Sequence, residues 1–187
     1  MSLEYAILGF LNYHPYTGYD LKKIFDNSVR HFWPADQSQI YRTLSRLTEQ
    51  GYVDMEKVAQ EDRPDRKVYH ITEAGRAALL AWLAAPAMHD EPRSAALIQV
   101  FFGGQLTDEQ ILAKFEDVAA ILRAVLAQYA EIPGRIDPYR QEIGSEREYF
   151  FWMLTLDNGL RSVRATLEWA ENVIARIKHG DVPPAER

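Results

Sequence analysis

The chain has 187 residues, enough for one ordinary domain or two small ones, and its 47% hydrophobic content excludes a disordered or fibrous protein. It has no cysteine, which excludes disulfide frameworks, thiolate zinc sites and cysteine nucleophiles. The net charge is −6, so any nucleic-acid site has to be a local basic surface. There is neither a membrane-spanning apolar run nor a signal-peptide pattern, and we therefore expect a soluble, cytoplasmic protein with no membrane partner.

Three short helices are predicted at the start of the chain. The first, over residues 3–11, is almost wholly apolar and is expected to be buried against the others. The second starts after Thr17, and the third runs from about Ala35 to Gln50 with Gly51 as its stop. The third helix carries one apolar stripe, formed by Ile40, Leu44 and Leu47.

The hydrophobic period changes after the third helix. Residues 52–58 and 67–71 are β-branched or aromatic and alternate roughly with polar residues, which predicts two strands joined by a polar hairpin tip. Thr72 is the predicted N-cap of a helix that follows. Three helices, a hairpin and a helix form the order of a winged helix-turn-helix domain.

The composition divides the chain into two parts. Residues 1–84 form the predicted winged helix-turn-helix domain, and residues 85–93, which hold two prolines, form a linker. Residues 94–182 are predicted to be helical throughout, and residues 183–187 to be a frayed tail. The expected fold class is therefore mainly α with a small β-hairpin, in which an all-helical C-terminal dimerisation domain follows the winged helix-turn-helix domain.

The second half contains three helical candidates. A short apolar helix ends at Gly103-Gly104, and a capping-box spacing between Thr107 and Gln110 opens a longer helix to about Tyr129. Prolines at 133 and 138 predict a break or kink. A long helix follows from about Glu146 to Lys178, with an expected interruption at residues 157–159.

The third helix carries the candidate DNA-reading residues. On a helical wheel its polar side chains point away from the apolar stripe, and arginine, glutamine, serine and tyrosine suit base edges and phosphates in a major groove. An ordinary solvated helix face remains the alternative. These residues are Ser38, Gln39, Tyr41, Arg42, Ser45 and Arg46.

The hairpin tip is the second basic element. Arg63, Arg66 and Lys67 would lie along backbone phosphates if the hairpin is a wing, although Asp62 and Asp65 weaken this patch. A charged turn that keeps the hairpin soluble is the alternative. The third helix and the basic tip in this order favour DNA binding.

Several motifs resemble the PadR family of bacterial transcriptional regulators. They are Gln39-Ile40-Tyr41-Arg42, Gly51-Tyr52-Val53 and the run from Arg66 to Gly75. Phe32-Trp33-Pro34 and Trp169 are similar to the branch of that family with a longer, virulence-activator-like C-terminal domain. The resemblance covers nearly the whole chain.

The resemblance implies a homodimer in which each subunit offers one recognition helix and one wing to half of a pseudo-palindromic operator in double-stranded DNA. A repressor is expected. In such regulators the C-terminal helices dimerise, and some members release DNA when they bind phenolic acids or planar aromatic drugs.

The long C-terminal helix supplies the candidates for these two roles. The turn around residues 149–152 is aromatic on every side, so we expect a partner subunit to bury it. The dimerisation candidates are Tyr149, Phe150, Met153, Leu160, Val163, Leu167 and Ile174. For an aromatic effector, Trp152 or Trp169 would stack the ring and Arg161 or Arg164 would meet a carboxylate, with core or interface packing as the alternative.

Enzyme functions find no support. The five histidines show no zinc-ligand spacing, and the chain has neither a G-x-S-x-G elbow nor a phosphate-binding glycine loop. We expect no catalytic residue, metal or cofactor. The competing class is a winged-helix module for protein–protein interaction or ligand binding without sequence-specific DNA binding; the acidic net charge favours it, and the basic tip opposes it.

Overall fold

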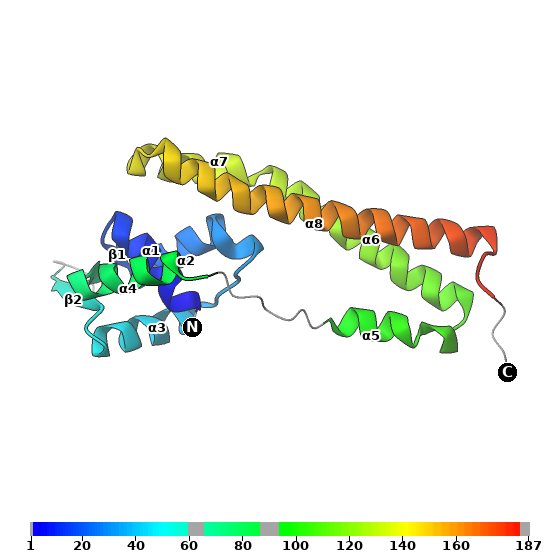
Figure 1. Ribbon diagram of the computed structural model, residues 1–187, viewed down its shortest axis with the longest axis horizontal. Helices are drawn as coiled ribbons and strands as arrows, with labels where there is room; N and C mark the ends of the chain where they lie inside the picture. The colour runs from blue at the N-terminus through cyan, green and yellow to red at the C-terminus, as the bar shows by residue number, and fades with distance from the viewer. Residues whose placement is uncertain (1, 60–65, 87–93, 184–187) are drawn as a thin grey trace. The chain divides into compact units, whose positions relative to one another are not determined.

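The computed structural model describes residues 2–59, 66–86 and 94–183 (Figure 1). The predicted wing residue Arg63, most of the predicted linker and the end of the predicted tail lie outside these ranges. The chain groups into two compact units. One comprises Met1–Ala87 with Gly134–Tyr149, and the other comprises Met88–Pro133 with Phe150–Arg187. The domain boundaries at residues 84 and 93 stay predictions.

The first unit contains the predicted order of helices and strands. The mainly helical fold with a small antiparallel sheet confirms the expected fold class. Its elements are α1 (Ser2–Tyr13), β1 (Tyr16–Thr17), α2 (Gly18–Asn27), η1 (Val29–His31), α3 (Gln37–Glu49), β2 (Val53–Val58), β3 (Arg66–Ile71) and α4 (Glu73–Ala84).

The sheet has three antiparallel strands in the order β1-β3-β2. The sequence predicted only the hairpin, because two residues are too few to show an alternating pattern. Tyr16 pairs with Tyr69 and Thr17 with Val68, so β1 covers the edge of β3 that β2 leaves open. The added strand ties the segment between α1 and α2 to the hairpin.

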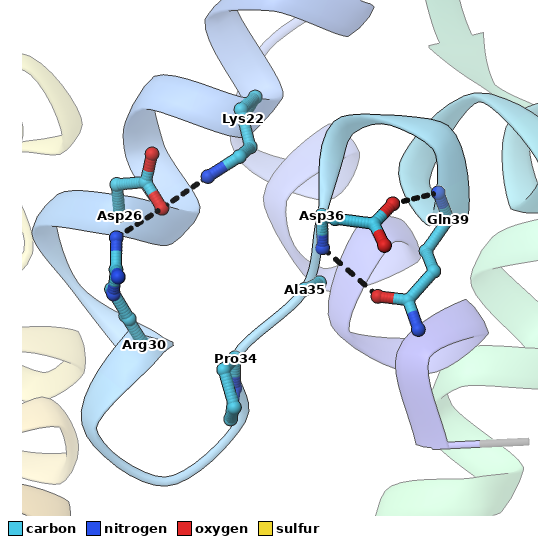
Figure 2. Close-up of a pocket in the computed structure, with 7 residues that line it drawn as sticks. All are labelled: Lys22, Asp26, Arg30, Pro34, Ala35, Asp36 and Gln39. Atoms are coloured by element: carbon cyan, nitrogen blue, oxygen red, sulfur yellow. Dashed lines mark hydrogen bonds and ion pairs between the residues drawn. The ribbon is translucent and has the colours of Figure 1, made fainter.

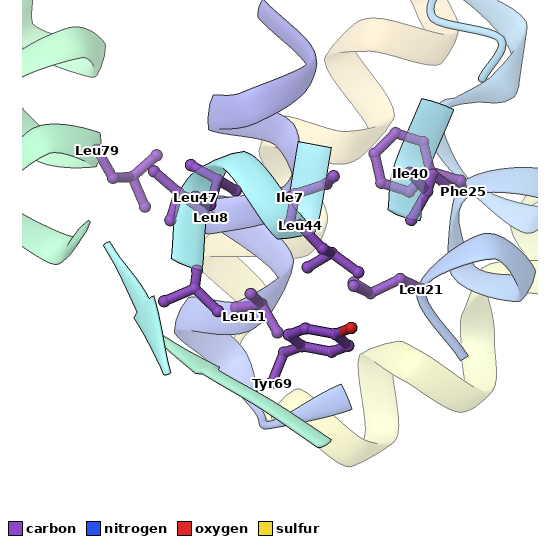
Figure 3. Packing of buried hydrophobic residues seen from close by; sticks show 11 residues of the cluster. Ile7, Leu8, Leu11, Leu21, Phe25, Ile40, Leu44, Leu47, Tyr69 and Leu79 are labelled. Atoms are coloured by element: carbon purple, nitrogen blue, oxygen red, sulfur yellow. The ribbon is translucent and has the colours of Figure 1, made fainter. Parts of the chain in front are cut away.

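The core of this unit lies between α1, α2, α3 and the sheet. Figure 3 shows the buried side chains converging there from all of these elements. The predicted stripe of α3 is buried, which confirms the orientation of that helix. The cluster consists of Ile7, Leu8, Leu11, Leu21, Phe25, Ile40, Leu44, Leu47, Val53, Tyr69 and Leu79.

Local hydrogen bonds define both ends of α3. Asp36 accepts from the backbone N–H of Gln39 at 2.7 Å, and the Gln39 side chain accepts from the N–H of Asp36 at 2.9 Å, which completes a capping box. At the other end Gly51 has φ 72°, which glycine adopts at little cost. Tyr52 N–H then donates to the carbonyl of Leu47 at 2.9 Å.

Helix α7 (Ile132–Ile143) and the first turn of α8 (Glu146–His179) contribute to the first unit. Tyr13 Oη donates to Glu148 Oε2 at 2.5 Å, and Asn27 Nδ2 donates to Tyr139 Oη at 3.3 Å. Burial, and after it the charge of Glu142, raises the pKa of Tyr16 to about 12. The Tyr16 hydroxyl is therefore protonated at neutral pH.

The sequence predicted a break or kink where α7 lies. In the structure, α6 (Asp108–Ala130) ends before this segment and α7 begins at Ile132. Pro133 stands in the first turn, where its missing N–H has no partner to lose. Pro138 lies inside the helix and removes one backbone hydrogen bond. The prolines thus indicated the boundary between α6 and α7, but the sequence did not predict α7 itself.

The second unit consists of α5 (Ala95–Phe101), η2 (Gly103–Gln105), α6 (Asp108–Ala130) and the rest of α8, with α6 and α8 side by side (Figure 1). Thr107 and Gln110 form the predicted capping box. Between α6 and α8 lies a cluster of Phe115, Ala170 and Ile177. Ion pairs flank it, from Arg123 to Glu171 at 2.6 Å and from Lys178 to Glu116 at 2.7 Å.

The expected interruption of α8 at residues 157–159 is wrong, since the helix is continuous there. A glycine inside a helix costs only about 1 kcal/mol relative to alanine. Leu156, directly before this segment, is 3% exposed, so packing compensates for that cost. Within the ranges that the structure describes, none of the helices is both long and apolar enough to span a bilayer.

The N-cap of α4 provides a test of the first unit's stability. Thr72 Oγ1 accepts from the N–H of Gly75 at 3.1 Å and donates to the carbonyl of Gly51 at 2.8 Å. Thr72→Ala is expected to lower the free energy of unfolding by about 1–2 kcal/mol in chemical denaturation. The control is Thr166→Ala, whose hydroxyl bonds only within α8. Equal stability of the two variants would contradict the role of this cap.

Candidate nucleic-acid interface

The outward face of α3 presents all six predicted residues to solvent. The guanidinium of Arg42 donates from Nε to the backbone carbonyl of Ser38 at 3.3 Å, so it lies along its own helix. No carboxylate within ion-pair distance of Arg42 is found among the described residues. The exposure of the six predicted side chains confirms the orientation of the helix, and their contact with DNA stays a prediction.

Gln39 has a structural role that the sequence reading did not assign. Its side-chain oxygen caps α3 by accepting from the N–H of Asp36. The amide group is therefore held at the first turn of the helix, where its NH₂ can still donate to another partner.

Tyr41 connects α3 to α2 and to the sheet. A Cβ atom at position 18 would lie 2.5 Å from the Tyr41 ring, so the ring rests on a glycine at the start of α2. Burial, and after it the neighbouring Tyr41, raises the pKa of Tyr69 on β3. Tyr41 thus lies where the outward side of α3 meets the face of the sheet that carries Tyr69.

That face of the sheet continues outward into two lysines. Side chains alternate along a strand, so Lys57 and Lys67 share the face of Tyr69, and the register places them directly opposite each other. Both are exposed, and in the described part of the chain neither has an ion-pair partner. The sequence reading proposed Lys67 but missed Lys57, because only the strand register brings the two together.

Two further predicted DNA-contacting arginines are each paired with a carboxylate. Arg66, at the start of β3, lies on the opposite face of the hairpin and its Nη2 is 3.4 Å from Asp20 Oδ2. The Nε of Arg46 on α3 is 2.5 Å from Glu4 Oε1 on α1. The sequence reading found the arginines and not their partners, which are distant in the chain.

A shallow hollow of about 370 Å³ lies beside the first turn of α3 (Figure 2). Two further cations line it, because Asp26 pairs with Lys22 and lies 3.4 Å from Arg30 Nη1. Asp36 also lines the hollow, so its two cations are balanced by two carboxylates and this edge of the α3 surface carries no net charge. The other lining residues are Pro34, Ala35, Asp36 and Gln39.

The chain matches two protein families in succession. Residues 7–81 match the transcriptional regulator PadR-like family, and residues 92–178 match the virulence activator alpha C-terminal family. A probable transcriptional regulator of Mycobacterium tuberculosis, Rv1176c, is 33% identical over 95% of this chain and 98% of its own length. This chain belongs to the PadR family of transcriptional regulators.

Two solved structures share the fold of this PadR-family chain over nearly its whole length. Bacillus subtilis PadR in complex with operator DNA has a TM-score of 0.79 and 25% identity, covering 95% of this chain and 99% of its own. The Vibrio cholerae virulence activator AphA has a TM-score of 0.74 and 29% identity, covering 95% and 98%. The predicted family, branch and absence of an enzyme function are confirmed by these relatives, which are transcriptional regulators.

The predicted dimerisation residues of this PadR-family chain have different surroundings. Ile174 packs against the cluster between α6 and α8 within one chain. Phe150 is exposed, and the others are half-buried in the single chain. These others are Tyr149, Met153, Leu160, Val163 and Leu167.

The predicted effector residues have different surroundings in the structure. Trp169 packs edge-on against Phe115 with 5.3 Å between ring centroids, and Trp152 is half-buried. The Nε of Arg161 is 2.8 Å from Asp157 Oδ2, whereas Arg164 is exposed. Of the two arginines, Arg164 is the one with no ion pair among the described residues.

The facing lysines of the wing provide a test that does not depend on DNA. Like charges directly opposite on neighbouring strands repel, so Lys57→Gln is expected to stabilise the protein by about 0.2–1 kcal/mol at low salt. The gain should shrink at high salt because of screening. Thermal denaturation at two salt concentrations measures both effects, with Lys23→Gln on α2 as the control. A destabilised Lys57→Gln variant would contradict the assigned register.

Proposed function

We propose that this chain is a homodimeric repressor that binds a pseudo-palindromic operator with α3 in the major groove and the β2–β3 wing along the phosphates. The observation that carries the proposal is the basic surface of Arg42, Lys57 and Lys67, whose charges are not neutralised by any carboxylate in the described ranges. The structure of the relative Bacillus subtilis PadR with operator DNA supports the same use of this fold. Such a protein acts on the chromosome, in the cytoplasm.

The residue types of this surface divide between base and phosphate contacts. A guanidinium on the outward face of α3, such as that of Arg42, suits the two acceptors of guanine in the major groove. Ser38 and Ser45 offer hydroxyls, and the lysines of the wing suit phosphates. A dimer that covers two grooves of a promoter also excludes polymerase from the same DNA, which favours repression.

Exposed apolar side chains in the second unit support the homodimer. Phe101 of α5 is 82% exposed and Ile121 of α6 is 63% exposed in the single chain. Large apolar side chains exposed in this number favour an interaction site, and a second copy of the same chain is the most economical partner. The other exposed residues of this group are Leu97, Ile98, Val100, Phe102, Phe150, Phe151, Leu154 and Trp169.

The proposal includes a planar aromatic effector that releases DNA. Trp169 uses one edge contact with Phe115 and remains 40% exposed, so an aromatic ring has a surface on which to stack. Arg164 is the better candidate for a carboxylate, because Arg161 is held by Asp157. To act as a signal, the effector has to bind more tightly to the conformation that cannot hold the operator.

The test of DNA binding uses Arg42→Ala and, as its control, Arg176→Ala in the last turn of α8. Arg42→Ala is expected to weaken binding to the DNA upstream of the gene by about 1–3 kcal/mol, without a change in melting temperature. Titration of labelled duplex measures both variants. If the parent protein binds this DNA no more tightly than a random duplex, the competing function as a protein-binding or ligand-binding module is favoured.

The test of the dimer compares two exposed apolar residues. Phe101→Asp is expected to dissociate the dimer at micromolar concentration, because a charge would be buried in the interface. Leu83→Asp on α4 of the first unit, where the leucine is 62% exposed, is the control and should leave the dimer intact. Light scattering after size exclusion gives the masses. A monomeric parent protein would contradict the proposal.

A further inference from the structure

Two of the cations proposed to contact DNA, one on α3 and one on the wing, are held by carboxylates from the first two helices. The pair between Arg46 and Glu4 joins α3 to α1 with 2.5 Å between Nε and Oε1. The Glu4 side chain is 14% exposed, whereas that of Arg46 is 52% exposed. A carboxylate so far removed from water needs its counter-charge, so Glu4 holds Arg46 more firmly than a surface ion pair would.

The second pair is anchored in the start of α2. Asp20 Oδ2 lies 3.4 Å from Arg66 Nη2 and also accepts a hydrogen bond from Thr17 Oγ1 at 2.7 Å. The Asp20 backbone N–H in turn donates to Thr17 Oγ1 at 3.1 Å, the N-cap bond of α2. The carboxylate is therefore positioned before any DNA arrives.

These pairs divide the basic residues of α3 and the wing into two classes. Arg42, Lys57 and Lys67 have no carboxylate partner in the described segments, whereas Arg46 and Arg66 each have one. A phosphate that approaches a paired arginine has to compete with a carboxylate already in place, so its net gain is small. A base edge with two acceptors at matched positions adds hydrogen bonds that a phosphate at random position lacks.

We propose that Glu4 is a specificity-determining residue. On DNA of unmatched sequence it keeps Arg46 neutralised and so suppresses sequence-independent phosphate binding. It releases the guanidinium only where contacts with the bases compensate for the lost ion pair. Asp20 does the same for Arg66 on the wing. This inference rests on the proposed DNA-binding function. It explains how an acidic protein discriminates between its operator and the excess of other DNA.

The test combines a charge-neutral substitution with its partner's removal. Glu4→Gln should raise affinity for a duplex of random sequence by at most about eightfold at about 0.1 M salt, because one released cation adds up to about 0.9 to the slope of log K against log salt. Affinity for the duplex upstream of the gene should rise less, so the ratio of the two affinities falls. In an Arg46→Ala background, Glu4→Gln should have no such effect.

The control is Glu49→Gln, which removes an exposed carboxylate three residues from Arg46 that has no ion pair in the described structure. If Glu49→Gln changes affinity as much as Glu4→Gln does, or if the gain persists without Arg46, general electrostatics explains the data and the proposal is wrong. Elution from heparin, a polyanion without bases, gives a second readout: Glu4→Gln should need more salt than Glu49→Gln.

The second pair keeps the test decisive if Glu4→Gln lowers the melting temperature. Asp20→Asn, with Asp54→Asn on β2 as its control, should raise random-duplex and heparin affinity only when Arg66 is present. Failure of both carboxylate variants in a protein that still binds its upstream DNA overturns this inference alone. A parent protein that binds no DNA overturns the proposed function as well.

Discussion

Burial of one stripe of α3 determines the geometry of the whole surface that we propose contacts DNA. Ile40 and Leu44 have no exposed surface, and they fix the helix against α1 and α2. Since a helix has only one rotation that buries this stripe, the polar residues between these positions have to face outward. The capping box at Asp36 and the glycine end at Gly51 then fix where the helix begins and ends.

The surface that results is basic only in places. The chain carries a net charge of −6, and its carboxylates are not spread evenly around the cations. The lysines of the wing face each other, and no residue that the structure describes supplies them with a counter-charge, while Arg46 lies against Glu4. In the proposed function, attraction to DNA arises from a few positions, and the ion pairs limit it elsewhere.

Local signals made helix starts in both units and the buried side of α3 predictable, whereas the long-range contacts were not predicted. Residues close together in the sequence are enough to predict the N-caps at Thr72 and Thr107 and the apolar stripe of α3. All three predictions agree with the structure. Glu4 and Arg46 are 42 positions apart, and the sequence between them does not indicate that they form an ion pair. Helix α7 escaped prediction for a different reason: a proline is found in the first turn of a helix as readily as after the end of one.

The buried positions of α8 also restrict how its sequence can vary. Leu156, Ala170 and Ile177 are separated by multiples of seven, so they occupy one side of the helix. Insertion of a single residue between Leu156 and Ala170 would rotate all later residues of the helix by about 100° about its axis and expose its buried side. Length variation among relatives in this helix should therefore come in whole heptads, whereas the turns at either end of it are free to grow by any number.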